Sequence, residues 1–114
     1  MPACLFCQIV NGQASGRIVY EDDMVVSFED IRPKAPVHLL LVPRKHIPTL
    51  LDLEPGDEIV IGHIFLLASR LARERGLAES GYRMVVNCGP GAGQSVYHIH
   101  FHLLGGRSLA WPPG

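Results

Sequence analysis

One stretch decides the fold of this chain: Tyr97-His98-Ile99-His100-Phe101-His102-Leu103-Leu104. A β-strand directs alternate side chains to opposite faces, so this spacing predicts a strand over 98–104 with three imidazoles along one face. The apolar residues between the histidines then point the other way, into a core. Imidazoles that titrate near neutral pH repel one another when all are charged, so some of them stay neutral. Such an arrangement is useful for proton transfer, phosphate binding or metal binding.

Length and charge limit the classes of protein to consider. The 114 residues are enough for one hydrophobic core, so we expect a single domain over 1–114. A net charge of −1 gives no electrostatic reason to expect nucleic acid or an anionic membrane as a partner. The longest apolar stretch, 59–68, is too short to span a bilayer, and no signal-peptide pattern precedes it. We expect a cytoplasmic protein whose three cysteines are reduced.

Periodicity and turn residues predict an α+β fold with a mainly antiparallel sheet. A short helix over 5–10 is expected to close at Gly12, and a long helix is expected to begin around Pro55 and stop at Gly76. Strands are predicted over 17–20, 24–28, 38–42, 82–87 and 98–104, with the first two joined as a hairpin.

The loop before the histidines is the second signal. Gly89, Gly91 and Gly93 let the backbone curl and present amide groups to an anion, and Gln94 and Ser95 add an amide and a hydroxyl. Most glycine loops are simple turns. A loop that opens directly onto aligned imidazoles instead predicts that donors converge on a phosphate.

The His-x-His-x-His pattern at 98–102, with apolar residues between, resembles the histidine triad superfamily. The blocks at 30–38, 43–47, 81–87, 93–97, 105–107 and 111–114 resemble its nucleotide-binding branch, so the likeness covers nearly the whole chain. It implies a histidine-triad-like fold: a five-stranded antiparallel sheet with one long and one short helix. It also implies a homodimer, joined through the long helix and a paired strand into one continuous sheet.

The activity that this resemblance implies is hydrolysis of purine nucleoside 5′-phosphoramidates, adenosine preferred, without a catalytic cofactor. His100 would be the nucleophile and form a nucleotidyl-histidine that water then cleaves. His102 would stabilise charge on a phosphate oxygen, while His38 and His98 would complete the histidine cluster. Ser95 would contact the leaving nitrogen, which departs as an amine.

The resemblance also implies a set of nucleotide contacts. Asp30 would accept hydrogen bonds from the ribose hydroxyls, and Trp111 would border the active site of the partner subunit and influence leaving-group preference. The sequence alone equally allows core roles for the two phenylalanines and a turn role for Asp30. The full set is Phe6, Phe28, Asp30, Ile31, Asn87, Gly93, Gln94, Ser95, His100, His102 and Trp111.

Metal binding is the competing use of the same residue types. Cys4 and Cys7 form a ligand pair, and His46 and His98 would complete a structural zinc site, as in zinc-bearing relatives. The two cysteines could equally be plain core residues. Two further readings stay open at this point. One is a metal-dependent hydrolase that uses His98, His100 and His102, and the other is a nucleotide-binding regulatory module with slow turnover.

Overall fold

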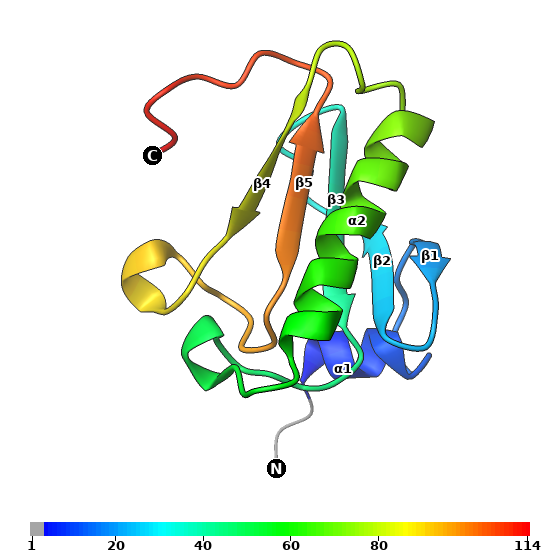
Figure 1. Cartoon of the computed structure of the whole chain (residues 1–114), viewed down its shortest axis with the longest axis vertical. Coiled ribbons are helices and arrows are strands. Elements are labelled where there is room, and N and C mark those ends of the chain that lie inside the picture. Colours follow the sequence, from blue (N-terminus) through cyan, green and yellow to red (C-terminus); the bar gives the residue numbers. More distant parts are fainter. Residues whose placement is uncertain (1–3) are drawn as a thin grey trace.

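A computed structural model describes residues 4–114 and shows one five-stranded antiparallel sheet in the order β1-β2-β3-β5-β4 (Figure 1). The strands are β1 (Ile18–Glu21), β2 (Val25–Glu29), β3 (Val37–Pro43), β4 (Tyr82–Val86) and β5 (Phe101–Gly105). The α-helices are α1 (Leu5–Val10) and α2 (Glu58–Glu74), and the 3-10 helices are η1 (Leu50–Asp52) and η2 (Pro90–Ala92). The predicted α+β fold is confirmed, while the two 3-10 turns were not foreseen.

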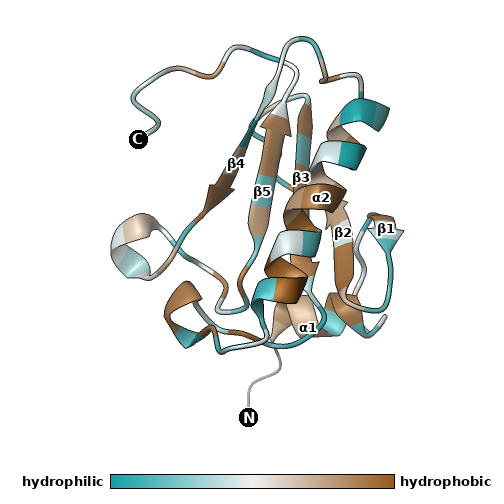
Figure 2. Ribbon diagram, in the orientation of Figure 1, coloured by the Kyte–Doolittle hydropathy of each residue, from teal (hydrophilic) through white to brown (hydrophobic). Residues whose placement is uncertain are grey.

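Each face of the sheet carries its own hydrophobic core. The long helix α2 covers one face, and the short helix α1 packs against the other. Figure 2 shows apolar residues concentrated on β2, β3, β5 and α2. Side chains alternate along β3, so Leu39 and Leu41 face α2, whereas Leu40 and Val42 face α1. Burying each such side chain contributes about 1.5–3 kcal/mol to folding.

The alternation predicted around the histidines is confirmed. Ile99, Phe101 and Leu103 are buried in the core beneath α2. His102 lies opposite Leu40 of β3 and Val85 of β4, so it projects from the face opposite α2. The sheet therefore separates its main core from the face that carries the histidines.

The predicted strand over 98–104 is wrong at its start, because β5 begins only at Phe101. The β3–β5 ladder ends at the pair Leu41–Phe101, and Pro43, two residues further along β3, has no N–H to donate. Ile99 instead donates its backbone N–H to the carbonyl of Ile47 at 2.7 Å. His98 consequently lies outside the sheet ladder, and its ring takes a separate direction.

The long helix starts later than Pro55, the predicted first turn. Residues 54–57 form a turn in which the Asp57 carboxylate accepts bonds from the Glu54 N–H and from the Lys45 ammonium, each at 2.8 Å. These bonds hold Asp57 as the residue before the helix, and α2 begins at Glu58. The predicted stop is confirmed: Gly76, at φ +76°, follows the last turn.

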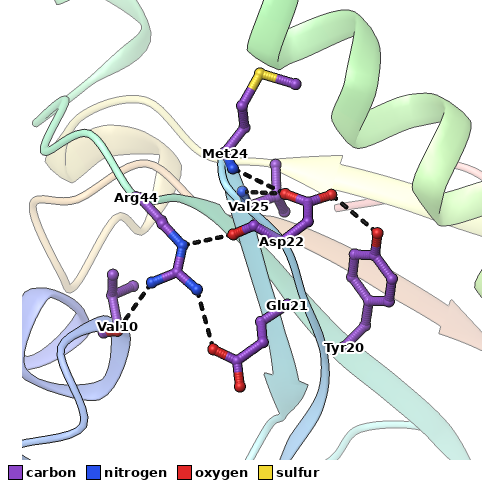
Figure 3. Close-up of polar contacts among 7 residues, drawn as sticks. All are labelled: Val10, Tyr20, Glu21, Asp22, Met24, Val25 and Arg44. Carbon is purple, nitrogen blue, oxygen red and sulfur yellow. Dashed lines mark hydrogen bonds and ion pairs between the residues drawn. The ribbon is translucent and has the colours of Figure 1, made fainter.

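The β1–β2 hairpin is fixed by Asp22 (Figure 3). One oxygen of its carboxylate accepts the N–H groups of Met24 and Val25 at 2.8 Å, and the other accepts the Tyr20 hydroxyl at 3.0 Å. His63 Nε2 on α2 lies 2.5 Å from that second oxygen, so His63 pairs with the hairpin instead of serving only as packing. Burial alone would raise the pKa of Asp22, but these hydrogen bonds outweigh it and hold the pKa well below its usual range.

Arg44, beside the hairpin, joins it to the short helix. Its guanidinium donates to the Asp22 carbonyl at 2.6 Å, to the Val10 carbonyl at 3.2 Å and to the Glu21 carboxylate at 3.0 Å (Figure 3). Among residues 4–114, no helix has the length and apolar character needed to cross a membrane.

Candidate active site

A cleft of about 310 Å³ lies on the sheet face opposite α2, beside α1. Its apolar walls include Phe6 and Phe28, whose rings meet edge to face with centroids 5.4 Å apart. Asp30, His100 and His102 also line it, and a carboxylate oxygen of Asp30 lies within 4.8 Å of a ring nitrogen of His102. The cleft thus collects seven of the residues predicted to bind nucleotide: Phe6, Phe28, Asp30, Ile31, Ser95, His100 and His102.

The tautomer of His100 follows from its hydrogen bond. Its Nδ1 lies 2.9 Å from the backbone carbonyl of His98, and a carbonyl oxygen can only accept. In the neutral ring Nδ1 therefore carries the proton, and Nε2 is left with a free lone pair.

A relay of two further hydrogen bonds fixes His102. The backbone N–H of Lys34 donates to Nδ1 of His38 at 3.0 Å, which places the proton of His38 on Nε2. That nitrogen lies 2.8 Å from Nδ1 of His102, so His102 accepts there and carries its own proton on Nε2. Burial and the neighbouring charges of His100 and His38 lower the pKa of His102 to about 4. Burial likewise lowers the pKa of His38, against the opposing effect of the Asp30 carboxylate 3.3 Å away.

A second cluster lies on the far side of His98. Nδ1 of His98 is 3.5 Å from the sulfur atoms of both Cys4 and Cys7 and 3.2 Å from Nδ1 of His46. The Cys7 sulfur is itself 3.2 Å from Nδ1 of His46. His98 Nε2 donates to the Pro43 carbonyl at 2.7 Å, so the lone pair of Nδ1 points at the cysteines. Burial lowers the pKa of His98, which keeps the ring neutral.

The model of one protein family, the HIT domain, matches residues 11–109. The chain belongs to the HIT domain family. The HIT chain also superimposes on the crystal structure of a HIT family hydrolase from Legionella pneumophila Philadelphia 1 with a TM-score of 0.96. The two sequences are 50% identical over 98% of this chain and 100% of that one. Such a match supports hydrolase chemistry in general.

Two other solved structures bear on the clusters of this HIT chain. A Zn-bound histidine triad family protein from Mycobacterium smegmatis is 36% identical over 92% of this chain and 76% of that one, with a TM-score of 0.80. A histidine triad nucleotide-binding protein from Candida albicans is 30% identical over 96% of this chain and 83% of that one, with a TM-score of 0.83.

The cysteine–histidine cluster of this HIT domain fits zinc. Tetrahedral bonds of about 2.3 Å to sulfur and about 2.0–2.1 Å to nitrogen place sulfur and nitrogen about 3.5 Å apart, and two nitrogens about 3.3 Å apart. The separations of 3.2–3.5 Å from Nδ1 of His98 lie close to these values. All four positions would come from the protein, which is typical of a structural site.

The alternative of a catalytic metal held by His98, His100 and His102 is wrong. Within residues 4–114, candidate ligand groups are Cys4-Cys7-His46-His98 and Asp30-His38-His102, so the three alternating histidines do not converge. The second group is also unsuited to a metal. A metal on Nε2 of His38 would require a proton on Nδ1, where the Lys34 N–H already donates.

The backbone N–H groups of the glycine loop mostly donate within the loop, where they fix its conformation. The N–H groups of Ala92, Gly93 and Gln94 donate to carbonyls inside the loop, and Gly89 and Gly93 adopt positive φ. Both amide protons of Gln94 are also used, on the carbonyls of Pro48 and Val96. Gln94 therefore has no donor left for a phosphate, and Ser95 is the loop residue that reaches the cleft.

Asn87 and Trp111, also predicted to contact nucleotide, are not part of the cleft lining. Asn87 shares an adjoining hollow with His38 and His102. Trp111 is 81% exposed, with the Arg83 guanidinium 6.0 Å from its ring centroid. The sequence did not single out the apolar wall made by Ile9, Leu40 and Val96 or the orienting N–H of Lys34; helical and strand periodicity could have suggested only the wall.

Proposed function

We propose that this HIT protein is a purine nucleoside phosphoramidase that prefers adenosine. One observation carries the proposal: His100, whose Nδ1 is held by the His98 carbonyl so that Nε2 is free, shares the cleft with two apolar rings and a carboxylate. A neutral imidazole is a competent nucleophile at pH 7 without a separate base. An apolar slot with a few polar groups is also the usual form of a small-molecule site.

The nucleoside would occupy the apolar end of the cleft. The rings of Phe6 and Phe28 and the exposed side chain of Ile31 provide faces against which a purine can pack. Asp30 would accept hydrogen bonds from the 2′ and 3′ hydroxyls of the ribose. The name of the Candida albicans neighbour supports nucleotide binding by a closely similar fold.

In the first step, Nε2 of His100 forms a bond to phosphorus while the P–N bond breaks. The departing nitrogen takes up a proton from solvent and leaves as a neutral amine, with Ser95 placed at the cleft to contact it. Nε2–H of His102 donates to a phosphate oxygen, where negative charge increases in the transition state. His38 holds His102 in this tautomer through its own Nε2–H.

In the second step, water attacks phosphorus and the bond to His100 breaks. The products are a nucleoside monophosphate and the free His100 ring, again with its proton on Nδ1. The residues described here supply nucleophile, charge stabilisation and orientation, so we propose no catalytic cofactor.

Trapping of the covalent intermediate tests the proposal. The protein is mixed with an adenosine phosphoramidate, quenched rapidly in base and analysed by peptide mass spectrometry. We expect one adenylyl group on His100 and its loss in His100→Asn, with His63→Asn as a control imidazole outside the cleft. An adduct on another residue, or undiminished turnover in His100→Asn, would refute the assignment.

We also propose a structural zinc ion on Cys4, Cys7, His46 and His98. The ligand spacing supports it, as does the zinc-bound neighbour from Mycobacterium smegmatis. Zinc bound there would hold the N-terminal helix against the sheet. A cytoplasmic location, where thiols stay reduced, fits cysteine ligands.

A homodimer completes the proposal. The outer side of α2 leaves Ile59, Phe65 and Leu66 exposed by 67%, 47% and 73%, and β4 is an edge strand. Pairing of two such edges and helices would cover both features and extend the sheet. Sedimentation velocity tests this: Leu66→Glu should yield monomers, and a wild-type monomer at high concentration would contradict it.

A further inference from the structure

The cationic side chains of this chain are unevenly paired. Of its ten lysines and arginines, five make no ion pair with a carboxylate in residues 4–114. Three of these five, Lys34, Arg83 and Arg107, line one hollow, and Arg32 lies two residues from Lys34 in the chain. The fifth, Arg73, lies in the last turn of α2.

The hollow adjoins the candidate active site. It measures about 250 Å³ and shares His102 with the cleft described above. Strand register explains why the hollow and the cleft share His102. Arg83 lies opposite Leu104, and Val85 lies opposite His102, so Arg83 and His102 project from the same face of the sheet. No aspartate or glutamate lines the hollow, which is walled by Lys34, His38, Arg83, Val85, Asn87, His102, Leu104, Arg107, Leu109 and Pro113.

Among the described residues, the hydrogen bonds of these three cations go only to neutral carbonyl oxygens, and the Arg83 guanidinium also lies 6.0 Å from the Trp111 ring centroid. Arg83 donates to the Leu109 carbonyl at 3.2 Å, and Arg107 donates to the carbonyls of Lys34 and Ser108 at 2.9 Å. The Lys34 ammonium donates to the Arg32 carbonyl at 3.1 Å. The two arginines thus hold the C-terminal segment, which runs beyond β4 in Figure 1, and their positive charges remain unbalanced.

Several positive charges in one hollow repel one another, and a chain of net charge −1 does not need them for solubility. An anion bound there removes that repulsion. The base and ribose fill the opposite end of the cleft in the proposed binding mode, and phosphorus lies between, at His100 and His102. The hollow then receives the group attached to phosphorus through nitrogen.

We propose that the leaving amine carries its own anionic group, a carboxylate or a phosphate, and that Lys34 is a main determinant of this preference, with Arg83 and Arg107. The inference rests on the proposed phosphoramidase function and names its substrate class: nucleoside phosphoramidates of acidic amines such as amino acids. Only the P–N bond breaks. The nitrogen takes up a proton and departs, and the anionic group is unchanged in the product.

The test compares two substrates of nearly equal size, adenosine phosphoramidates of glycine and of glycinamide, which differ in one negative charge. We expect wild-type kcat/KM to be about tenfold higher for the glycine compound in low salt, and the ratio to fall as salt screens the charges. A ratio is used because any change in folding or chemistry common to both substrates cancels.

Matched variants assign the effect to the hollow. Lys34→Gln should lower the glycine-to-glycinamide ratio about threefold, the size expected for one partly exposed ion pair. Arg73→Gln removes the same charge from the last turn of α2, outside the hollow, and should leave the ratio as in wild type. Phosphoramidates of O-phosphoethanolamine and of ethanolamine form a second pair. Whichever pair gives the larger ratio identifies the anion as carboxylate or phosphate.

The outcomes separate the two proposals. Turnover with a ratio near one for both pairs, or a ratio that Lys34→Gln leaves unchanged, overturns the inference while the phosphoramidase function stands. Absence of turnover with every compound refutes the phosphoramidase function, and the inference falls with it.

Discussion

Replacement of Asp22 should destabilise the protein by an amount that depends on pH. Its carboxylate accepts two backbone N–H groups and a phenol (Figure 3). It also pairs with His63 of α2. A hydrogen bond to a charged group contributes about 1.5–3 kcal/mol, and bonds that share one acceptor are not additive. Because 24% of the side chain is exposed, we expect Asp22→Ala to cost about 3 kcal/mol at pH 7. Asp22→Asn keeps an acceptor oxygen for the backbone and should cost about 1 kcal/mol.

The sign of the pH effect follows from the lowered pKa of Asp22. An aspartate in the unfolded chain has a pKa of about 3.9. The stabilisation is therefore complete above about pH 5 and is lost as the pH falls toward the lower pKa of Asp22 in the folded protein. The difference between wild type and Asp22→Asn should therefore shrink on acidification. Urea unfolding followed by circular dichroism at pH 7, 4 and 3 measures it.

Asp23→Asn is the matched control, because it removes the same charge from a neighbouring side chain that makes none of these contacts. An unfolding free energy for Asp22→Ala within about 0.5 kcal/mol of wild type at pH 7 would refute the reasoning, since surface changes have effects of that size. So would a difference that grows on acidification.

Four further predictions concern other parts of the chain. Ser27 has a fully buried hydroxyl without a hydrogen-bond partner among the described residues, so Ser27→Ala should stabilise the protein by about 1 kcal/mol; a lower thermal midpoint would contradict this. Purified protein should contain about one zinc per chain, and Cys4→Ser or a strong chelator should lower the free energy of unfolding by about 4 kcal/mol for zinc a thousandfold above its Kd; native protein with free thiols and no metal would refute the zinc site. His38→Ala should lower kcat about 10²-fold, with partial recovery in His38→Gln, whose amide can donate to His102; equal rates for the two variants would argue against tautomer control. Deletion of 111–114 should change the preference among leaving amines more than nucleotide affinity, as measured by paired kcat/KM and equilibrium titration; unchanged preference would count against a role for Trp111.

The fold could be predicted from the sequence where a local rule decides the structure. The 3.6-residue period of α2, its stop at Gly76 and the alternation of Ile99, Phe101 and Leu103 all follow from side-chain geometry and backbone freedom. The start of β5 could not be predicted, because it depends on the missing N–H of Pro43 across the sheet. Pairing between strands depends on tertiary structure, so it cannot be predicted from the sequence of one strand.

In the candidate site, too, some features could be predicted from the sequence and others depend on tertiary contacts. Seven of the residues that line the cleft were predictable because the family resemblance names them. The resemblance also implied separate roles for His98 and His100, but residue spacing alone could not show them: the two are two residues apart, yet one ring turns to the cysteines and the other to the cleft. Gln94 looked like a phosphate donor, but both of its amide protons hold the loop. Hydrogen-bond partners distant in sequence decide such roles.

His98 contacts both the cysteine–histidine cluster and the candidate active site. Its ring faces the cysteine pair, and its carbonyl oxygen accepts the hydrogen bond from Nδ1 of His100, which leaves Nε2 of the neutral His100 ring free. On the proposed function, a compound that removes the zinc would therefore misalign His100 without entering the substrate cleft. Inhibitors of this kind would act noncompetitively, because they would bind at the cysteine pair and leave the cleft open to nucleotide.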